Sequence, residues 1–202
     1  MSNVKIQNLF GLVLVGGKST RMGKDKAALR YYGKSQSIHC YEMLTSFCEN
    51  VFLSNRKGQA EEEGQKGYPQ IHDKEPFLEV GPMGGILSAM AEYPEADWLV
   101  LACDLPFVSS GVLEYLLKHR NHGKKATAFV SRHDHLPEPL CAVYERHCRD
   151  FLLAYFQQGK HCPRQFLIQS DAELLVAPYT LALENVNNPE ELQSSLKKLK
   201  EG

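Results

Sequence analysis

Nearly continuous apolar runs alternate with amphipathic segments along this chain. Residues 9–15, 51–54 and 97–103 form three such runs, and runs of this kind are typical of strands buried on both faces of a parallel sheet. Residues 37–49 and 109–119 carry apolar side chains at helical spacing. Strands that alternate with helices predict an α/β fold of three layers, α/β/α, with a Rossmann-like, mostly parallel central sheet and right-handed crossovers.

Shorter segments complete the predicted order of elements. Residues 70–72 and 126–130 are expected strands, a glycine-rich segment at 81–90 is expected to open a helix, and residues 145–156 read as a further helix. Residues 163–167 are expected to form only a short turn. Because no repeat or linker interrupts the pattern, we expect residues 1–202 to form a single α/β domain.

The polar residues that follow the predicted strands mark the candidate site. Carboxyl ends of parallel strands meet at one edge of a sheet, and ligands bind in the crevice there. Val15, Ser54 and Cys103 end the three apolar runs, so we expect them to face one crevice. Asn55 and Asp73 follow strands that end at the same edge, and either could meet a nucleotide.

The first apolar run passes into a loop whose residue types suit a polyphosphate. Gly16 and Gly17 would let backbone N–H groups approach phosphate oxygens closely, and Arg21 and Lys26 would offset the negative charge. The spacing is not that of a Walker A loop, because Leu12 stands where that motif needs glycine. A glycine turn leading into an exposed basic loop is the simpler alternative.

An acidic residue follows the third run and could hold a metal ion. Asp104 precedes Leu105-Pro106 at the end of a buried strand, and Mg²⁺ needs only one or two carboxylates together with phosphate oxygens. The alternative is that Asp104 caps the helix expected near Ser109.

Taken together, these motifs resemble those of the molybdenum cofactor guanylyltransferases, which are nucleotidyltransferases. Residues 16–26 match the pattern GGxSxRMGxDK without a break, residues 81–86 are similar to GPLAGI, and residues 103–106 match CDxP. Residues 139–144 resemble a PLxAxY strand that faces the acceptor substrate, and residues 185–192 resemble NxNTPEDL. Val15 departs from the alanine that is usual in the family, and Gly84 replaces an alanine, which we expect to change side-chain bulk only.

The resemblance implies a set of site residues. Arg21, Lys26 and Asp104 would be catalytic, with Asp104 on Mg²⁺, and Asp73 would read guanine or ribose. The local sequence explains Asn188 as a helix cap and Pro189 as the first residue of a helix. It does not explain the other two asparagines of the motif, and the resemblance implies that they lie near the phosphates or the metal. The implied nucleotide-binding residues are Leu14, Val15, Gly16, Gly17, Arg21, Lys26, Asn55, Asp73, Gly81, Asp104, Asn185 and Asn187.

The resemblance also implies a reaction. The protein would transfer GMP from GTP to the terminal phosphate of molybdenum-bound molybdopterin and release pyrophosphate, in transient contact with proteins that deliver the cofactor or mature molybdoenzymes. Three alternatives stay open: a cytidylyltransferase acting on the same pterin, a sugar-phosphate type of nucleotidyltransferase, and a non-catalytic nucleotide-binding module. The glycine-rich segment at 81–86 favours guanine.

Composition indicates which partners and which cellular compartment to expect. A net charge of −1 gives no general attraction to nucleic acid or anionic lipid. Because no apolar run is long enough for a bilayer and no signal peptide precedes residue 9, we expect a cytoplasmic protein without membrane contact. Six cysteines without a C-x-x-C pair indicate reduced thiols, and a zinc site from His147, Cys148, His161 and Cys162 is the less favoured alternative. His133 and His135 are expected on an exposed loop.

Overall fold

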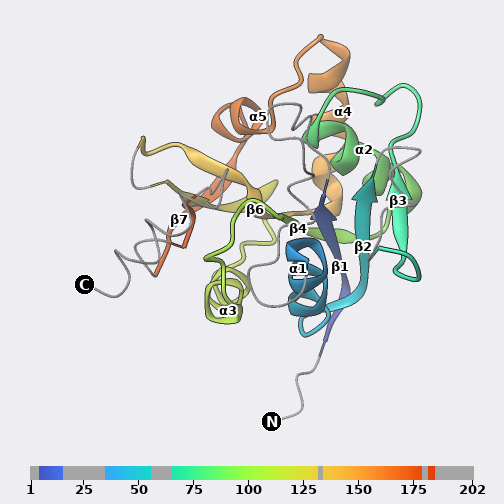
Figure 1. Cartoon of the computed structure of the whole chain (residues 1–202). Helices are drawn as coiled ribbons and strands as arrows, with labels where there is room; N and C mark the ends of the chain where they lie inside the picture. The colour runs from blue at the N-terminus through green and yellow to red at the C-terminus, as the bar shows by residue number, and fades with distance from the viewer. Residues whose placement is uncertain (1–4, 16–34, 56–64, 132–133, 179–181, 185–202) are drawn as a thin grey trace.

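The described part of the chain is built around one twisted sheet. The computed structural model describes residues 5–15, 35–55, 65–131, 134–178 and 182–184. These residues form a seven-stranded sheet in the order β3-β2-β1-β4-β6-β5-β7 (Figure 1). The strands are β1 (Ile6–Leu14), β2 (Cys48–Asn55), β3 (Gln70–His72), β4 (Asp97–Ala102), β5 (Ala126–Val130), β6 (Pro137–Tyr144) and β7 (Ala172–Val176).

Helices cover both faces of the sheet, which confirms the three-layer α/β/α prediction. In Figure 1, α1 and α3 lie on one side of the sheet, and α2, α4 and α5 lie on the other. Each side has its own core of buried apolar residues, because alternate side chains of the strands point to opposite faces. The helices are α1 (Gln36–Leu44), α2 (Pro82–Glu92), α3 (Ser110–Lys118), α4 (Arg149–Gln157), preceded by the 3₁₀ turn Arg146–Cys148, and α5 (Pro163–Gln169).

The register of the central strands brings their carboxyl ends to one edge. β1 runs parallel to both β2 and β4, and Leu14 lies opposite Ser54 on one side and Ala102 on the other. α1 packs closely over β1 because Gly11 has no side chain: a Cβ there would lie 3.0 Å from Leu44 Cδ1. The fold therefore presents the three predicted strand ends side by side.

β6 is the exception to the parallel arrangement. It runs antiparallel to both β4 and β5, with Leu101 opposite Cys141 and Ala126 opposite Tyr144. Since β6 runs in the reverse direction, its first residues lie at the edge where β4 ends. The sheet is mostly parallel, as expected, but this strand delivers its amino end to the crevice.

Several elements differ from the sequence-based expectation. α1 ends at Leu44 instead of residue 49, because Cys48 already begins β2 and the carbonyl of Phe47 accepts a hydrogen bond from Ile6. Residues 163–169 form the helix α5 and not merely a turn. β7 was not expected; it is an edge strand in which Leu174 and Val176 are 45% and 64% exposed, so its apolar pattern does not mark a buried run.

Within the described residues, no helix combines the length and the apolar character that crossing a membrane requires.

Candidate functional site

Backbone hydrogen bonds join the segments that follow the parallel strands. The N–H of Cys103 donates to the carbonyl of Leu14 at 3.3 Å, and the N–H of Val15 donates to the carbonyl of Ser54 at 3.4 Å. Further along the edge, the N–H of Asp73 donates to the carbonyl of Asn55 at 3.3 Å. These bonds extend the sheet by one residue at each strand end, so the polar residues there are held in a fixed row.

A small open pocket lies at this edge. Its volume is about 20 Å³, so the enclosed part suits a small polar edge of a ligand. Its lining includes four residues that the sequence marked for nucleotide binding. The lining residues are Leu14, Ser54, Asn55, Asp73, Gly81, Pro82 and Gly85.

Two glycines shape the pocket for different reasons. Gly81 precedes α2 with φ 70° and ψ −147°, a backbone conformation that only glycine adopts readily. Gly85 lies in the first turns of α2, where an added Cβ would overlap Ser54 Oγ and lie 3.1 Å from Leu14 Cδ2. The absence of a side chain at Gly85 thus lets α2 approach the ends of β1 and β2 and close one side of the pocket.

The surroundings of Gly84 contradict the expectation that glycine in place of alanine changes only side-chain bulk. A Cβ at this position would overlap the backbone carbonyl oxygen of Phe77 and would lie 2.9 Å from Val80 Cγ2. The replacement of the family's alanine by glycine therefore does more than change bulk, because the segment between β3 and α2 packs into the space that an alanine would fill.

Asn55 has a buried side chain with well-defined partners. It is 2% exposed, and its Nδ2 donates to Gln65 Oε1 at 2.8 Å and to Gln70 Oε1 at 3.0 Å. Its Oδ1 is buried and has no hydrogen-bond partner among the described residues. A buried acceptor left in this state is costly unless something donates to it.

Asp104 lies in the turn after β4, at the same edge. It is half-buried, and its charge, after burial itself, contributes to raising the pKa of Cys40 to about 12. The alternative that Asp104 caps the following helix is wrong, because Ser109 occupies the N-cap position of α3. Asp104 therefore has another role than capping α3, and a carboxylate oxygen is a ligand that fits Mg²⁺.

Glu138 is a second acidic residue at this edge that sequence reasoning missed. Burial raises the pKa of Glu138, and the negative charge of Asp104 adds to that effect, while Arg164 and the N–H of Leu140 oppose it. The side chain is 4% exposed, accepts from Leu140 N–H at 2.9 Å and pairs with Arg164 Nη2 at 3.1 Å. A lone acid between two prolines in an otherwise apolar strand was the available sequence signal.

Six of the twelve predicted nucleotide-binding residues lie outside the residues that the structure describes. Val15 lies at the edge described above, but the glycine-rich loop and the C-terminal asparagine motif lie outside the described residues. These residues are Gly16, Gly17, Arg21, Lys26, Asn185 and Asn187, together with His133 of the polar loop.

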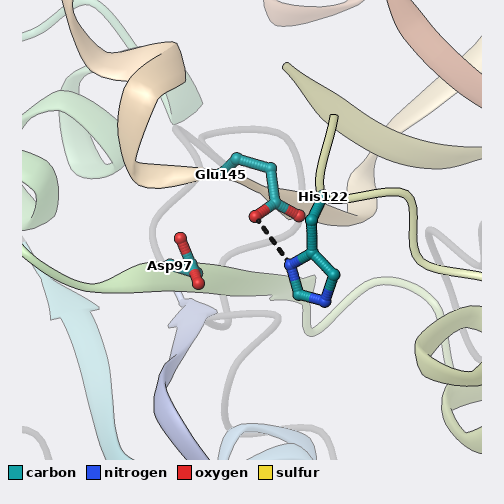
Figure 2. A group of neighbouring side chains, drawn as sticks. All are labelled: Asp97, His122 and Glu145. Atoms are coloured by element: carbon teal, nitrogen blue, oxygen red, sulfur yellow. Dashed lines mark ion pairs between the residues drawn. The ribbon is translucent and has the colours of Figure 1, made fainter. Parts of the chain in front are cut away.

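A different acidic cluster lies at the far end of β4. Figure 2 shows Asp97, His122 and Glu145, whose ligand atoms lie within 4.8 Å of one another. Asp97 begins β4 whereas Asp104 follows its end, so roughly 20 Å of strand separates the two acids. His122 Nδ1 lies 3.4 Å from Glu145 Oε2, and its side chain is 71% exposed.

Arg120 is the buried counter-ion of both acids in this cluster. Its Nη2 lies 2.6 Å from Asp97 Oδ2 and its Nε lies 2.7 Å from Glu145 Oε1, with the guanidinium side chain 3% exposed. Burial would lower the pKa of Arg120, but the hydrogen bonds and charges of Glu145 and Asp97 outweigh it and the pKa is raised. We therefore interpret the cluster as a buried ion-pair network that stabilises the fold.

The cysteines do not form a metal site in the described part of the chain. Five of the six thiols are buried and Cys162 is exposed. No cluster of potential metal ligands among the described residues includes His147, Cys148, His161 or Cys162, so the zinc alternative gains no support.

Known proteins resemble this chain in sequence over most of its length. Residues 11–174 match the MobA-like NTP transferase domain. The chain is 37% identical over 183 residues to a molybdenum cofactor biosynthesis bifunctional protein of Synechocystis sp., covering 91% of this chain but 52% of that protein, so it spans about half the length of that relative. It is 31% identical over 193 residues to a probable molybdenum cofactor guanylyltransferase of Nostoc sp., covering 93% of this chain and 90% of the relative.

A solved structure shares the fold over nearly the whole chain. The molybdopterin-guanine dinucleotide biosynthesis protein A of Archaeoglobus fulgidus superposes with a TM-score of 0.73 at 24% identity, covering 96% of this chain and 100% of the other. With the family domain matched over most of the chain and a full-length relative above 30% identity, this chain belongs to the MobA-like nucleotidyltransferases, the family of the molybdenum cofactor guanylyltransferases.

Proposed function

We propose that this protein transfers GMP from GTP to the terminal phosphate of molybdenum-bound molybdopterin, in the cytoplasm. The observation that carries the proposal is the pocket that gathers Leu14, Asn55, Asp73 and Gly81 at one sheet edge. Asp104 follows the strand that is hydrogen-bonded to the same edge. The name of the Nostoc relative, a probable molybdenum cofactor guanylyltransferase, supports the choice of guanine and of the molybdenum cofactor as acceptor.

The nucleoside end of GTP would lie against the pocket. Asn55 Oδ1 and the Asp73 carboxylate are hydrogen-bond acceptors there, and guanine presents two neighbouring donors, N1–H and N2–H₂. Adenine lacks this pair of donors. Because the pocket is small, the ribose and phosphates would extend along the sheet edge toward the end of β1.

The phosphates would then meet the loop that follows Val15. In this proposal the backbone N–H groups at Gly16 and Gly17, with Arg21 and Lys26, hold the triphosphate, and Asn185 and Asn187 contribute from the C-terminal segment. Asp104 would hold Mg²⁺, whose charge supports the phosphate oxygens during transfer.

The chemistry requires no protein nucleophile. An oxygen of the acceptor's terminal phosphate forms a new bond to the α-phosphorus of GTP, the bond from that phosphorus to the bridging oxygen breaks, and pyrophosphate leaves with the bonding electrons. Phosphoryl and nucleotidyl transfers of this kind depend mainly on positioning and on stabilising charge. Arg21 and Lys26 would stabilise the charge that develops on the leaving pyrophosphate.

Pyrophosphate release tests the proposal directly. The full chain is incubated with GTP, CTP, ATP or UTP, with and without molybdopterin, and with Mg²⁺ or with a chelator. We expect release that needs GTP, the pterin and the divalent cation together. Preference for CTP would assign the protein to cytidylyl transfer, release with a sugar phosphate in place of the pterin would change the acceptor class, and binding without release would indicate a nucleotide-binding module. Proteins that deliver the pterin or receive the product would act as transient partners.

A further inference from the structure

We propose that Gln65 and Gln70 are positioning residues that hold the amide of Asn55 in a single orientation, with its oxygen toward the pocket, and so select a base that donates hydrogen bonds. The inference rests on the proposed function, because it concerns how the same pocket recognises GTP. It adds two residues that no sequence motif of the chain indicated.

Both protons of the Asn55 amide are used by the two glutamines. Nδ2 donates to Gln65 Oε1 at 2.8 Å and to Gln70 Oε1 at 3.0 Å. An amide nitrogen has two protons to donate, so Nδ2 is fully satisfied. Asn55 is 2% exposed and Gln65 is 3% exposed, so little solvent is available to replace these partners.

Gln70 cannot turn over to accommodate a reversed Asn55. Its Nε2 donates to the backbone carbonyl of Gln65 at 3.2 Å. A flipped Gln70 would point its oxygen at that carbonyl, and a flipped Asn55 would point its oxygen at two glutamine oxygens. Either change sets acceptor against acceptor, which a buried site disfavours strongly. A backbone carbonyl therefore fixes the orientation of Gln70, and Gln70 in turn fixes Asn55.

The remaining atom, Asn55 Oδ1, defines what the pocket can accept. It is buried, it has no partner within the described residues, and Asn55 lines the pocket. Asp73, whose carboxylate is also an acceptor, lines the same pocket. Two acceptors that line one pocket suit the adjacent N1–H and N2–H₂ donors of guanine, whereas the corresponding edges of adenine and cytosine carry ring-nitrogen acceptors. A site built to hydrogen-bond a donor rejects ligands that lack it.

Nucleotide binding without the acceptor tests this inference. Dissociation constants for GTP, ATP and CTP are measured by calorimetry on the full chain, on the double variant Gln65→Leu/Gln70→Leu, and on Gln70→Met alone. With the glutamines gone, the Asn55 amide can turn and present its N–H₂ to the pocket. We expect the ratio of GTP affinity to ATP affinity to fall about tenfold in the double variant, and in the same direction but less in Gln70→Met.

A matched control separates this effect from general loosening. Asn121 is an amide whose Nδ2 donates to Glu173 Oε2 at 2.8 Å near the far edge of the sheet. Asn121→Leu should leave the affinity ratio unchanged. Thermal unfolding is followed for every variant, and Gln70→Met, at a half-buried position, keeps the test usable if the double variant does not fold.

The outcomes distinguish the inference from the proposed function. If the wild type prefers GTP and the glutamine variants keep that preference, or lose affinity for all three nucleotides by one factor, the positioning role is refuted while guanylyl transfer stands. If the wild type prefers another nucleotide or binds none, the proposed function fails, and the claim that the glutamines select a donor-bearing base fails with it.

Discussion

The N–H of Cys103 donates to the carbonyl of Leu14 across 3.3 Å, one residue beyond the last paired positions of β4 and β1. This bond joins the segment that carries Asp104 to the segment from which the predicted phosphate loop starts. Any ligand that contacts both segments is therefore held by groups with a fixed separation, which is what in-line transfer between two phosphates requires.

Removing the charge of Asp104 tests its proposed metal role. Asp104→Asn keeps the size of the side chain but weakens its hold on a cation, so we expect turnover to fall about 10²- to 10³-fold with little change in unfolding temperature. Pyrophosphate release at saturating GTP and Mg²⁺ measures this. Asp150→Asn, at a side chain that is 82% exposed, is the control. A wild-type rate for Asp104→Asn would remove the metal assignment.

The two adjacent glycines of α2 should respond differently to alanine. Gly85→Ala would bring Cβ against Ser54 Oγ, and Ser54→Ala removes that atom, so the double variant should recover much of the lost stability. Gly84→Ala would press on the backbone carbonyl of Phe77, which no side-chain change can remove. We expect each single variant to cost about 1–3 kcal/mol of unfolding free energy, measured by urea denaturation.

Gly123→Ala is the control for both variants. Its added Cβ would lie 3.4 Å from Asn121 Oδ1, an ordinary contact distance. If Ser54→Ala fails to relieve Gly85→Ala, the close approach of α2 to β2 does not limit stability at this position.

The fold was predictable because its central strands are buried on both faces. β1, β2 and β4 appear as apolar runs that need no tertiary information, and the polar residues after them had to share an edge once the strands were taken as parallel. This reasoning predicts Asn55 and Asp73 at one edge, and both line one pocket with Leu14 and Gly81. The roles of these residues stay predictions.

What was missed depends on contacts between distant parts of the chain. β7 carries half-exposed apolar residues and is defined by its pairing with β5, which no local pattern reveals. Glu138 reaches the site because β6 runs antiparallel to its neighbours. Gln65 and Gln70 follow a polar stretch and matter only because both amides meet Asn55. Periodicity records burial, but it does not record hydrogen bonds of this kind.

The network around Arg120 should be essential for stability and dispensable for chemistry. Arg120→Met removes the buried guanidinium that pairs with both the Asp97 and the Glu145 carboxylates, so we expect a loss of about 3–5 kcal/mol in unfolding free energy. Lys124→Met, which breaks an exposed pair with Asp171, should change little. Chemical denaturation measures both, and turnover per folded molecule should stay at the wild-type level. A large fall in that turnover would instead link the network to the crevice.

The buried thiols should be unreactive in the folded protein. Burial raises the pKa of Cys40, Cys48 and Cys148 to about 12, whereas Cys162 is exposed. Since the thiolate is the reactive form, a disulfide reagent at pH 8 should label one thiol rapidly, and all six after denaturation. Cys162→Ser should abolish the rapid phase. Rapid labelling of two or more thiols in the native protein would contradict the burial.

The same thiols should make the fold sensitive to alkali. Their pKa is about 12 when folded and near 9.0 when unfolded, so between these values the unfolded chain has released protons that the folded chain retains. The thiols' contribution to stability is therefore complete below about pH 9 and declines as the pH rises. For each buried thiol, the free energy of unfolding should fall by about 1 kcal/mol between pH 8 and pH 10. One such contribution is measured by comparing urea midpoints at pH 8 and pH 10 for the wild type and for Cys48→Ala. The midpoint of the variant should fall less between the two pH values. An equal fall would mean that the Cys48 thiol is no more shielded from solvent in the folded chain than in the unfolded one.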